Sequence, residues 1–213
     1  MSRVRLGVLA SGRGSNLQAI IDAVESGIVQ ARVAVVISNK KDAQALERAR
    51  IHGVPDVYLD PTRYAGMNDK REAYDRGILD ILRKHEVDLV LLAGYMKIVT
   101  PVLIDAYRNH MMNIHPSLLP SFPGLDAQKQ ALEWGAKVSG CTVHFVTEGV
   151  DEGPIIVQAT VPVLEGDSPE TLASRILVEE HAMYPRAVQL YADGRLIVEG
   201  RRVRIADGPA GCV

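Results

Sequence analysis

Residues 5–27, RLGVLASGRGSNLQAIIDAVESG, decide the fold of this chain. The apolar run at 5–10 predicts a buried strand, and the spacing of apolar residues in 16–27 predicts a helix. Gly12 and Gly14 stand between them and allow the tight turn that joins a strand to a helix. A strand that leads into a helix in this way starts the βαβ unit of a parallel sheet.

The same alternation continues through the first half of the chain. Residues 32–38, 55–59 and 87–94 read as further strands. Residues 42–53 and 68–85 carry apolar side chains at helical spacing. Because strands that alternate with helices pair in parallel, we expect an α/β fold with a Rossmann-like, mostly parallel sheet and helices on both faces. The run VDLVLLAG at 87–94 is the most apolar, so we expect it at the centre of the sheet.

The second half of the chain has a different pattern. Residues 139–147 and 154–164 read as longer strands, and a helix is predicted from about 168 to 191. The segment 194–208, GRLIVEGRRVRIADG, reads as a hairpin. We therefore expect a mixed sheet in the C-terminal half, within one α/β domain that spans residues 1–213.

Composition excludes several classes of protein. The chain has 213 residues, of which 47% are hydrophobic and 23% charged, with a formal net charge of −2. This profile is typical of a soluble globular protein with no general affinity for nucleic acid or anionic membranes. We see no membrane-spanning run, no signal peptide, no CxxC pair and no HExxH motif, so we expect a cytoplasmic protein without disulfides or metal.

Residues 110–124, HMMNIHPSLLPSFPG, carry the strongest catalytic signal. Asn113 and His115 lie two residues apart at the end of an apolar run, so in a strand they point to the same side. Pro116 then ends the strand. An amide can stabilise an oxyanion, and an imidazole can move a proton near neutral pH. From these residues alone, a loop with a structural histidine is an equal alternative.

The glycine-rich turn at residues 9–18 is a second candidate site. Ser15 or Asn16 can cap the helix that follows, and the free N–H groups there form an anion site suited to a phosphate. A dinucleotide fingerprint would need glycine in place of Leu17 and an acidic residue in place of the Ser-Asn pair at 38–39. NAD binding is therefore disfavoured, and a turn without any ligand is the remaining alternative.

Three further features have two interpretations each. The segment 92–99, LAGYMKIV, follows the central strand, where open α/β sheets bind ligands, but it also fits an ordinary loop. The loop at 148–153 is usually a solvated turn, and Asp151 would raise the pKa of His115 only if the fold brought the two together. Glu180 lies at the edge of an apolar stripe and needs a cationic partner, either a ligand amine or an arginine.

Eight segments occur in one order along the chain: ASGRGSNLQAII, ISNKKDAQALERA, REAYD, LAGYMKIV, MNIHPSLLPSFPG, TVHFV, GVDEGPIIVQA and EEHAMYP. Together they resemble the phosphoribosylglycinamide formyltransferases, the folate-dependent enzymes of de novo purine synthesis. NIHPSLLP marks the wider formyltransferase family, while GRGSNLQAI and EEHAMYP narrow the resemblance to the glycinamide ribonucleotide branch.

The resemblance implies a reaction, its partners and two functional halves. The glycyl amine of 5'-phosphoribosylglycinamide attacks the formyl carbon of 10-formyltetrahydrofolate directly. The folate is a cosubstrate, and no metal is implied. We expect a phosphate-binding half at residues 1–100 and a catalytic and folate-binding half at 101–213. The expected partners are these small molecules, with the protein a monomer or a weak homodimer.

The resemblance also implies the site residues. The catalytic residues are Asn113, His115 and Asp151. The substrate-binding residues are Gly14, Ser15, Asn16, Leu177 and Glu180. The folate-binding residues are Arg71, Met96, Lys97, Ile98, Val99, Asn113, Thr147, Glu148, Gly149, Val150 and Asp151. Lys97 stands where an arginine is expected, and Asp126 stands where relatives often have histidine.

Two classes of alternative remain from the sequence. The first is another formyl-folate enzyme, a formyltetrahydrofolate hydrolase or a protein similar to methionyl-tRNA formyltransferase. Both carry an extra domain, for which 213 residues leave little room. The second is a non-catalytic phosphate-binding module, which would not need Asn113, His115 and Asp151 together.

Overall fold

The structure is a computed structural model that describes residues 3–208. The contacts between residues divide the chain into two compact units, Met1–Met112 and Asn113–Val213. The expectation of one domain with halves at 1–100 and 101–213 stays a prediction. Cys212, one of the two cysteines, lies outside the described residues.

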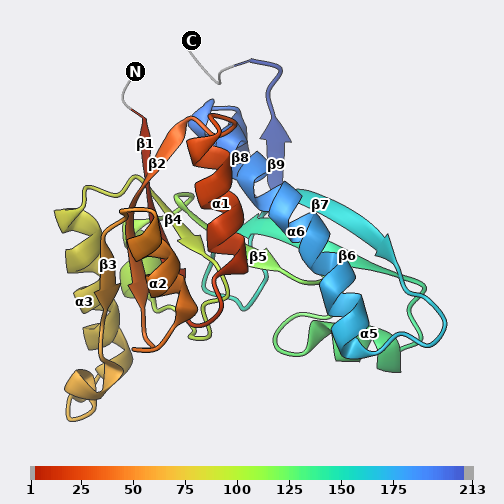
Figure 1. Cartoon of the computed structure of the whole chain (residues 1–213), viewed down its shortest axis with the longest axis horizontal. Coiled ribbons are helices and arrows are strands. Elements are labelled where there is room, and N and C mark those ends of the chain that lie inside the picture. Colours follow the sequence, from red (N-terminus) through yellow and green to blue (C-terminus); the bar gives the residue numbers. More distant parts are fainter. Residues whose placement is uncertain (1–2, 209–213) are drawn as a thin grey trace. The chain divides into compact units, whose positions relative to one another are not determined.

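The first unit is a parallel α/β layer (Figure 1). Its strands are β1 (Val4–Ala10), β2 (Ala31–Ser38), β3 (Asp56–Tyr58) and β4 (Leu89–Leu92). Its helices are α1 (Ser15–Glu25), α2 (Gln44–Ile51), the short 3-10 helix η1 (Pro61–Tyr64), α3 (Lys70–Lys84) and α4 (Pro101–Ala106). The strands lie in the order β3-β2-β1-β4, and each neighbouring pair is parallel. This confirms the predicted Rossmann-like parallel sheet.

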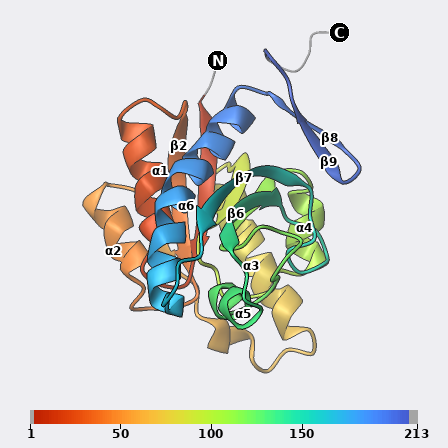
Figure 2. The ribbon, with the colours of Figure 1, turned by 90° about the vertical axis from the view of Figure 1, so that its right-hand side faces the viewer.

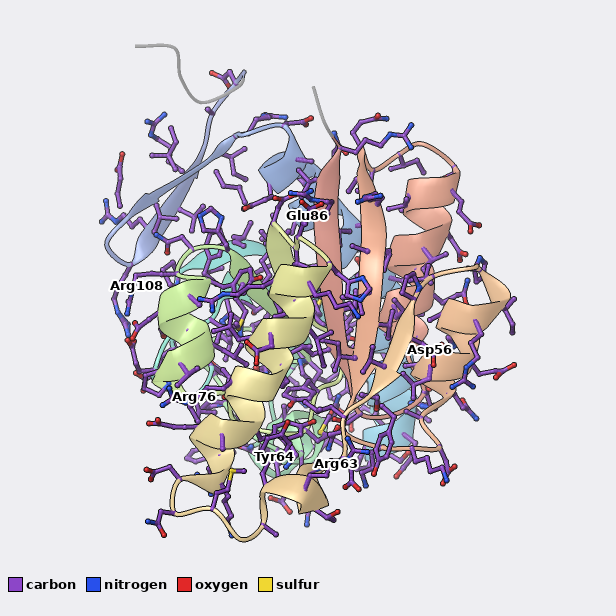
Figure 3. The ribbon with its side chains drawn as sticks, turned by 90° about the vertical axis from the view of Figure 1, so that its left-hand side faces the viewer. Asp56, Arg63, Tyr64, Arg76, Glu86 and Arg108 are labelled. Carbon is purple, nitrogen blue, oxygen red and sulfur yellow. The ribbon has the colours of Figure 1, made fainter. Side chains whose placement is uncertain are left out.

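Helices cover both faces of this layer, as predicted. Helices α1 and α2 pack on one face, and α3 packs on the other (Figures 2 and 3). All four residues of β4 are buried. β4 pairs with β1 on one side, and on the other side the Val90 N–H donates to the carbonyl of His110, 2.9 Å away. β4, the most apolar strand, therefore lies in the interior of the sheet, because it makes backbone hydrogen bonds at both of its edges.

Strand β5 (Met111–His115) runs from the first unit into the second. Met111 and Met112 are buried in the first unit. The strand ends directly before Pro116, as its sequence predicts, because proline cannot donate to a sheet ladder.

The second unit carries the predicted mixed sheet. Its further strands are β6 (Val138–Phe145), β7 (Ile155–Pro162), β8 (Leu196–Glu199) and β9 (Arg202–Ile205). β6 and β7 are antiparallel, β7 and β9 are parallel, and β8 and β9 form the predicted hairpin. Helices α5 (Ala127–Glu133) and α6 (Pro169–Ala192) complete the unit, and α6 packs on β6 and β7. None of the helices within residues 3–208 has the length and apolar character that a membrane span requires.

Candidate active site

Asn113, His115 and Asp151 meet in the second unit. The side chains of Asn113 and His115 come from β5, and Asp151 comes from the turn between β6 and β7. One carboxylate oxygen of Asp151, Oδ2, lies 3.2 Å from Nδ1 of His115. The other, Oδ1, lies 3.3 Å from Nδ2 of Asn113. The fold therefore brings the carboxylate to the Asn-x-His pair.

His115 is 4% exposed, and oxygen atoms face both of its ring nitrogens. Nε2 lies 2.9 Å from the carbonyl oxygen of Phe122, and Nδ1 faces Asp151. Burial lowers the pKa of His115, whereas the Phe122 carbonyl and the Asp151 charge raise it. Burial dominates, so the pKa lies below its ordinary value. Asp151 acts in the expected direction, although its charge does not outweigh burial.

The two oxygens around His115 nevertheless favour the protonated ring when a proton is available. A neutral imidazole has one N–H, so either tautomer leaves one nitrogen lone pair facing an oxygen acceptor. Uptake of a second proton turns both contacts of His115 into N–H···O hydrogen bonds. The site is therefore built to hold His115 neutral at rest and to stabilise a proton that arrives during a reaction.

Asp151 stays ionised although it is half-buried. Burial raises its pKa, but hydrogen bonds from His144 and from the Gly124 backbone lower it, as do the charges that His115 and His144 carry when they are protonated. The net pKa of Asp151 lies below its usual value. The Gly124 N–H donates to Oδ2 at 2.8 Å, so this oxygen faces both Gly124 and His115.

His144 on β6 is a further member of the site. Its ring is 2% exposed, its Nδ1 lies 2.9 Å from the Phe145 carbonyl, and its Nε2 lies 3.2 Å from Nδ2 of Asn113. Because Nδ1 faces a carbonyl, it carries a proton, while Nε2 faces both the Asn113 amide and, at 3.6 Å, the Asp151 carboxylate. In the sequence, His144 alternates with Thr142 and Val146 in a predicted strand, and this pattern is too weak to place His144 beside Asn113.

The first unit holds the glycine-rich turn before α1. Gly14 has a φ of +69°, and a Cβ at this position would lie 2.8 Å from the backbone of Ala45. Only glycine fits both constraints without strain. The turn is held by the Ala45 N–H, which donates to the Gly12 carbonyl, and by the Arg48 side chain, which donates to the Arg13 carbonyl. Helix α1 then begins at Ser15, so its N-terminal N–H groups face this turn.

A cavity of about 530 Å³ also lies in the first unit. Arg71, Met96, Lys97 and Ile98, all of them predicted folate contacts, line it. Val99, the fifth predicted contact of this unit, is buried and is not among the lining residues. The ammonium of Lys97 lies 5.1 Å from the centre of the Tyr74 ring, within cation–π range. The cavity thus combines apolar side chains with three cationic ones, those of Lys70, Arg71 and Lys97, and with the Asp75 carboxylate.

The remaining predicted residues lie in the second unit. Thr147, Glu148, Gly149 and Val150 form the turn after β6, where Glu148 and Val150 are exposed. Leu177 and Glu180 lie on α6, and Glu180 is buried. Arg175, on the same helix, forms a 2.7 Å ion pair with Asp167. Within residues 3–208, no cluster of histidine, cysteine and carboxylate side chains is arranged to hold a metal ion.

Known proteins resemble this chain over most of its length. A family model described as formyl transferase matches residues 4–188. A phosphoribosylglycinamide formyltransferase from Escherichia coli (strain K12) is 48% identical over 189 residues, which cover 89% of this chain and 87% of that protein. The crystal structure of glycinamide ribonucleotide transformylase 1 from Symbiobacterium toebii has a TM-score of 0.93 and 58% identity, covering 97% of this chain and 95% of that one.

A formyltetrahydrofolate deformylase from Pseudomonas syringae pv. tomato is less similar. Its crystal structure has a TM-score of 0.86 and 31% identity. The match covers 96% of this chain but only 66% of the deformylase chain. The chain therefore shares the fold of both kinds of protein, with much higher identity to the transformylase.

Proposed function

The chain belongs to the formyl transferase family, and we propose that it transfers the formyl group of 10-formyltetrahydrofolate to the glycyl amine of 5'-phosphoribosylglycinamide. This is a step of de novo purine biosynthesis. The observation that carries the proposal is the buried contact of Asn113 and His115 with the Asp151 carboxylate. The relatives from Escherichia coli and Symbiobacterium toebii bear the names of enzymes with this activity.

The proposed reaction is a direct attack of the amine on the formyl carbon. A C–N bond forms to the amine, and the formyl oxygen becomes an oxyanion. The Asn113 amide donates to this oxyanion, using the N–H that now makes the long 3.3 Å contact with Asp151. The bond from the formyl carbon to N10 of the folate then breaks, and the proton lost by the amine ends on N10.

His115, together with Asp151, relays that proton between the two nitrogens through a water at the Asp151 carboxylate. Its lowered pKa keeps the ring neutral and able to accept a proton. Once protonated, the ring donates to Asp151 and to the Phe122 carbonyl, which stabilises the transient charge. No covalent enzyme intermediate is required.

The two substrates are assigned to separate features. Gly14, Ser15 and Asn16 bind the phosphate of 5'-phosphoribosylglycinamide through the N-terminus of α1, and Glu180, with Leu177 beside it, meets the glycyl amine. The folate contacts are divided between the cavity, the segment Met96–Val99 and the turn that contains Thr147, Glu148, Gly149, Val150 and Asp151. We expect a cytoplasmic monomer or weak homodimer whose reaction needs no metal and whose partners are these small molecules.

A formyl-transfer assay tests the proposal. We expect formylated product when both 5'-phosphoribosylglycinamide and 10-formyltetrahydrofolate are supplied. A hydrolase would instead release formate when the amine substrate is omitted, since water would replace it. A phosphate-binding module would show no folate-dependent shift in melting temperature. Formate release without the amine, or no turnover at all, would contradict the proposed reaction.

A further inference from the structure

The loop from Pro116 to Gly124 supplies two of the backbone atoms that hold the catalytic groups. The Phe122 carbonyl faces Nε2 of His115 at 2.9 Å, and the Gly124 N–H donates to Asp151 at 2.8 Å. The position of this loop therefore sets both the orientation of the imidazole and the location of the carboxylate. We propose that Thr142 and Gln158 are positioning residues that hold this loop. The inference rests on the proposed function of His115 and Asp151.

Thr142 and Gln158 face each other across the antiparallel pair of β6 and β7. The Thr142 hydroxyl donates to the Ser117 carbonyl at 2.7 Å and accepts from the Leu119 N–H at 3.0 Å. It also accepts from the Gln158 amide at 2.9 Å. One donor and two acceptor sites are all that a hydroxyl offers, so every site of Thr142 is used.

Gln158 adds a second connection to the same loop. Its amide nitrogen donates to the Leu119 carbonyl at 2.9 Å as well as to Thr142. The two side chains thus bind three backbone groups of the loop, at Ser117 and on both sides of Leu119. Thr142 is fully buried, so any one of these contacts, once lost, would leave a polar group without a partner in the interior.

The loop needs such an anchor because its own backbone is strained. Phe122 has a φ of +54°, in the left-handed region that residues with a Cβ rarely adopt. This conformation is the one in which the Phe122 carbonyl faces His115. A strained residue persists only where its surroundings hold it, and such residues gather at functional sites.

Close packing also holds the loop against β6. Gly140 lies two residues before Thr142 on β6, and a Cβ there would lie 2.8 Å from the Leu118 side chain. The loop therefore lies directly against β6 with no room for a side chain between them. The hydrogen bonds of Thr142 and Gln158 then fix the position of the loop on β6, because hydrogen bonds constrain both distance and direction.

The test removes each anchor and compares the result with a matched control. Thr142→Val keeps the shape of the side chain but removes the hydroxyl, whereas Thr142→Ser keeps the hydroxyl and should retain the activity of the parent enzyme. In Gln158→Leu both amide donations are lost. Gln158→Glu should lose them above the carboxyl pKa, because a carboxylate cannot donate. Thr160→Val is the control, because Thr160 is exposed two residues further on the same strand.

We expect Thr142→Val and Gln158→Leu to lower kcat by roughly 10- to 100-fold, the range of a misplacement of about 1 Å, with KM values changed less than about threefold. Thr142→Ser and Thr160→Val should stay near the parent enzyme. The NMR titration of His115 should shift in the two impaired variants only. The titration can be measured even if the parent protein transfers no formyl group. That result would refute the proposed function, and the titration would still test whether Thr142 and Gln158 position the loop.

The proposal is overturned if Gln158→Leu and Thr142→Val keep both kcat and the His115 titration. It is also overturned if their losses appear only as a lower melting temperature that Thr142→Ser shares. Should Thr142→Val fail to fold, Gln158→Leu decides by itself, because Gln158 is an exposed residue at the edge of the network.

Discussion

Replacing Asp151 by asparagine removes the charge that faces His115 and leaves the size of the side chain almost unchanged. The carboxylate oxygen that lies 3.2 Å from Nδ1 of His115 also accepts from the Gly124 N–H. The amide oxygen can occupy that place, but its NH2 group then faces the Asn113 amide, which is also a donor. The variant therefore loses the ionic contact and gains a donor–donor clash.

The expected magnitude follows from the geometry. An opposite charge within hydrogen-bonding distance of a buried ionisable group changes its pKa by about 1–3 units. Each unit corresponds to about 1.4 kcal/mol, so the imidazolium loses about 1.4–4 kcal/mol of stabilisation. The pKa of His115, which burial already lowers, should fall further in Asp151→Asn. Turnover should drop by roughly two to four orders of magnitude, as is typical for acid–base groups.

An NMR titration of His115, with single-turnover rates measured alongside, tests this reasoning. Folate binding should stay largely intact, because the lost interaction acts mainly in the transition state. Glu152→Gln is the matched control, because it removes a charge from the exposed neighbouring residue. An unchanged His115 titration would remove Asp151 from the proton transfer. A rate close to that of the parent enzyme would remove it from the mechanism altogether.

Three further outcomes follow from the geometry. Gly14→Val should weaken binding of 5'-phosphoribosylglycinamide more than binding of the folate. It should also destabilise the fold by about 1–3 kcal/mol, because the valine side chain would overlap α2. Equal losses of both affinities in a folded variant would contradict the assignment of Gly14 to the phosphate site. Lys97→Met should raise KM for the folate with little change in kcat, and Lys97→Arg should not, which steady-state kinetics can decide. His115 and Asp151 both have lowered pKa values in the folded protein, so the unfolded chain binds more protons. The stability that His115 contributes should be present above about pH 6.5 and lost below it, whereas the stability that Asp151 contributes should be lost only below about pH 4. Denaturant unfolding measured at pH 3–8 should show these two steps. His115→Gln should abolish the step near pH 6.5.

The sequence by itself determined the architecture. The apolar run and helical spacing in residues 5–27 predicted β1 and α1, and the run at 87–94 predicted an interior strand. Pro116 predicted where β5 ends. These features depend on neighbours within a few residues, since the period of apolar positions reports the local backbone geometry. The same locality made Gly14 identifiable as a turn residue.

Only the tertiary structure decided the chemistry around His115. The sequence places Asp151 in a loop 36 positions further on, and no local pattern predicts that its carboxylate lies 3.2 Å from the imidazole. Nor does any pattern show that the Phe122 carbonyl faces the other nitrogen, or that Gln158 reaches Leu119. The sign of the His115 pKa shift came from burial, and burial belongs to the packed chain as a whole. Local periodicity specifies helices and strands, whereas distances across the chain and desolvation are set only when those elements pack together.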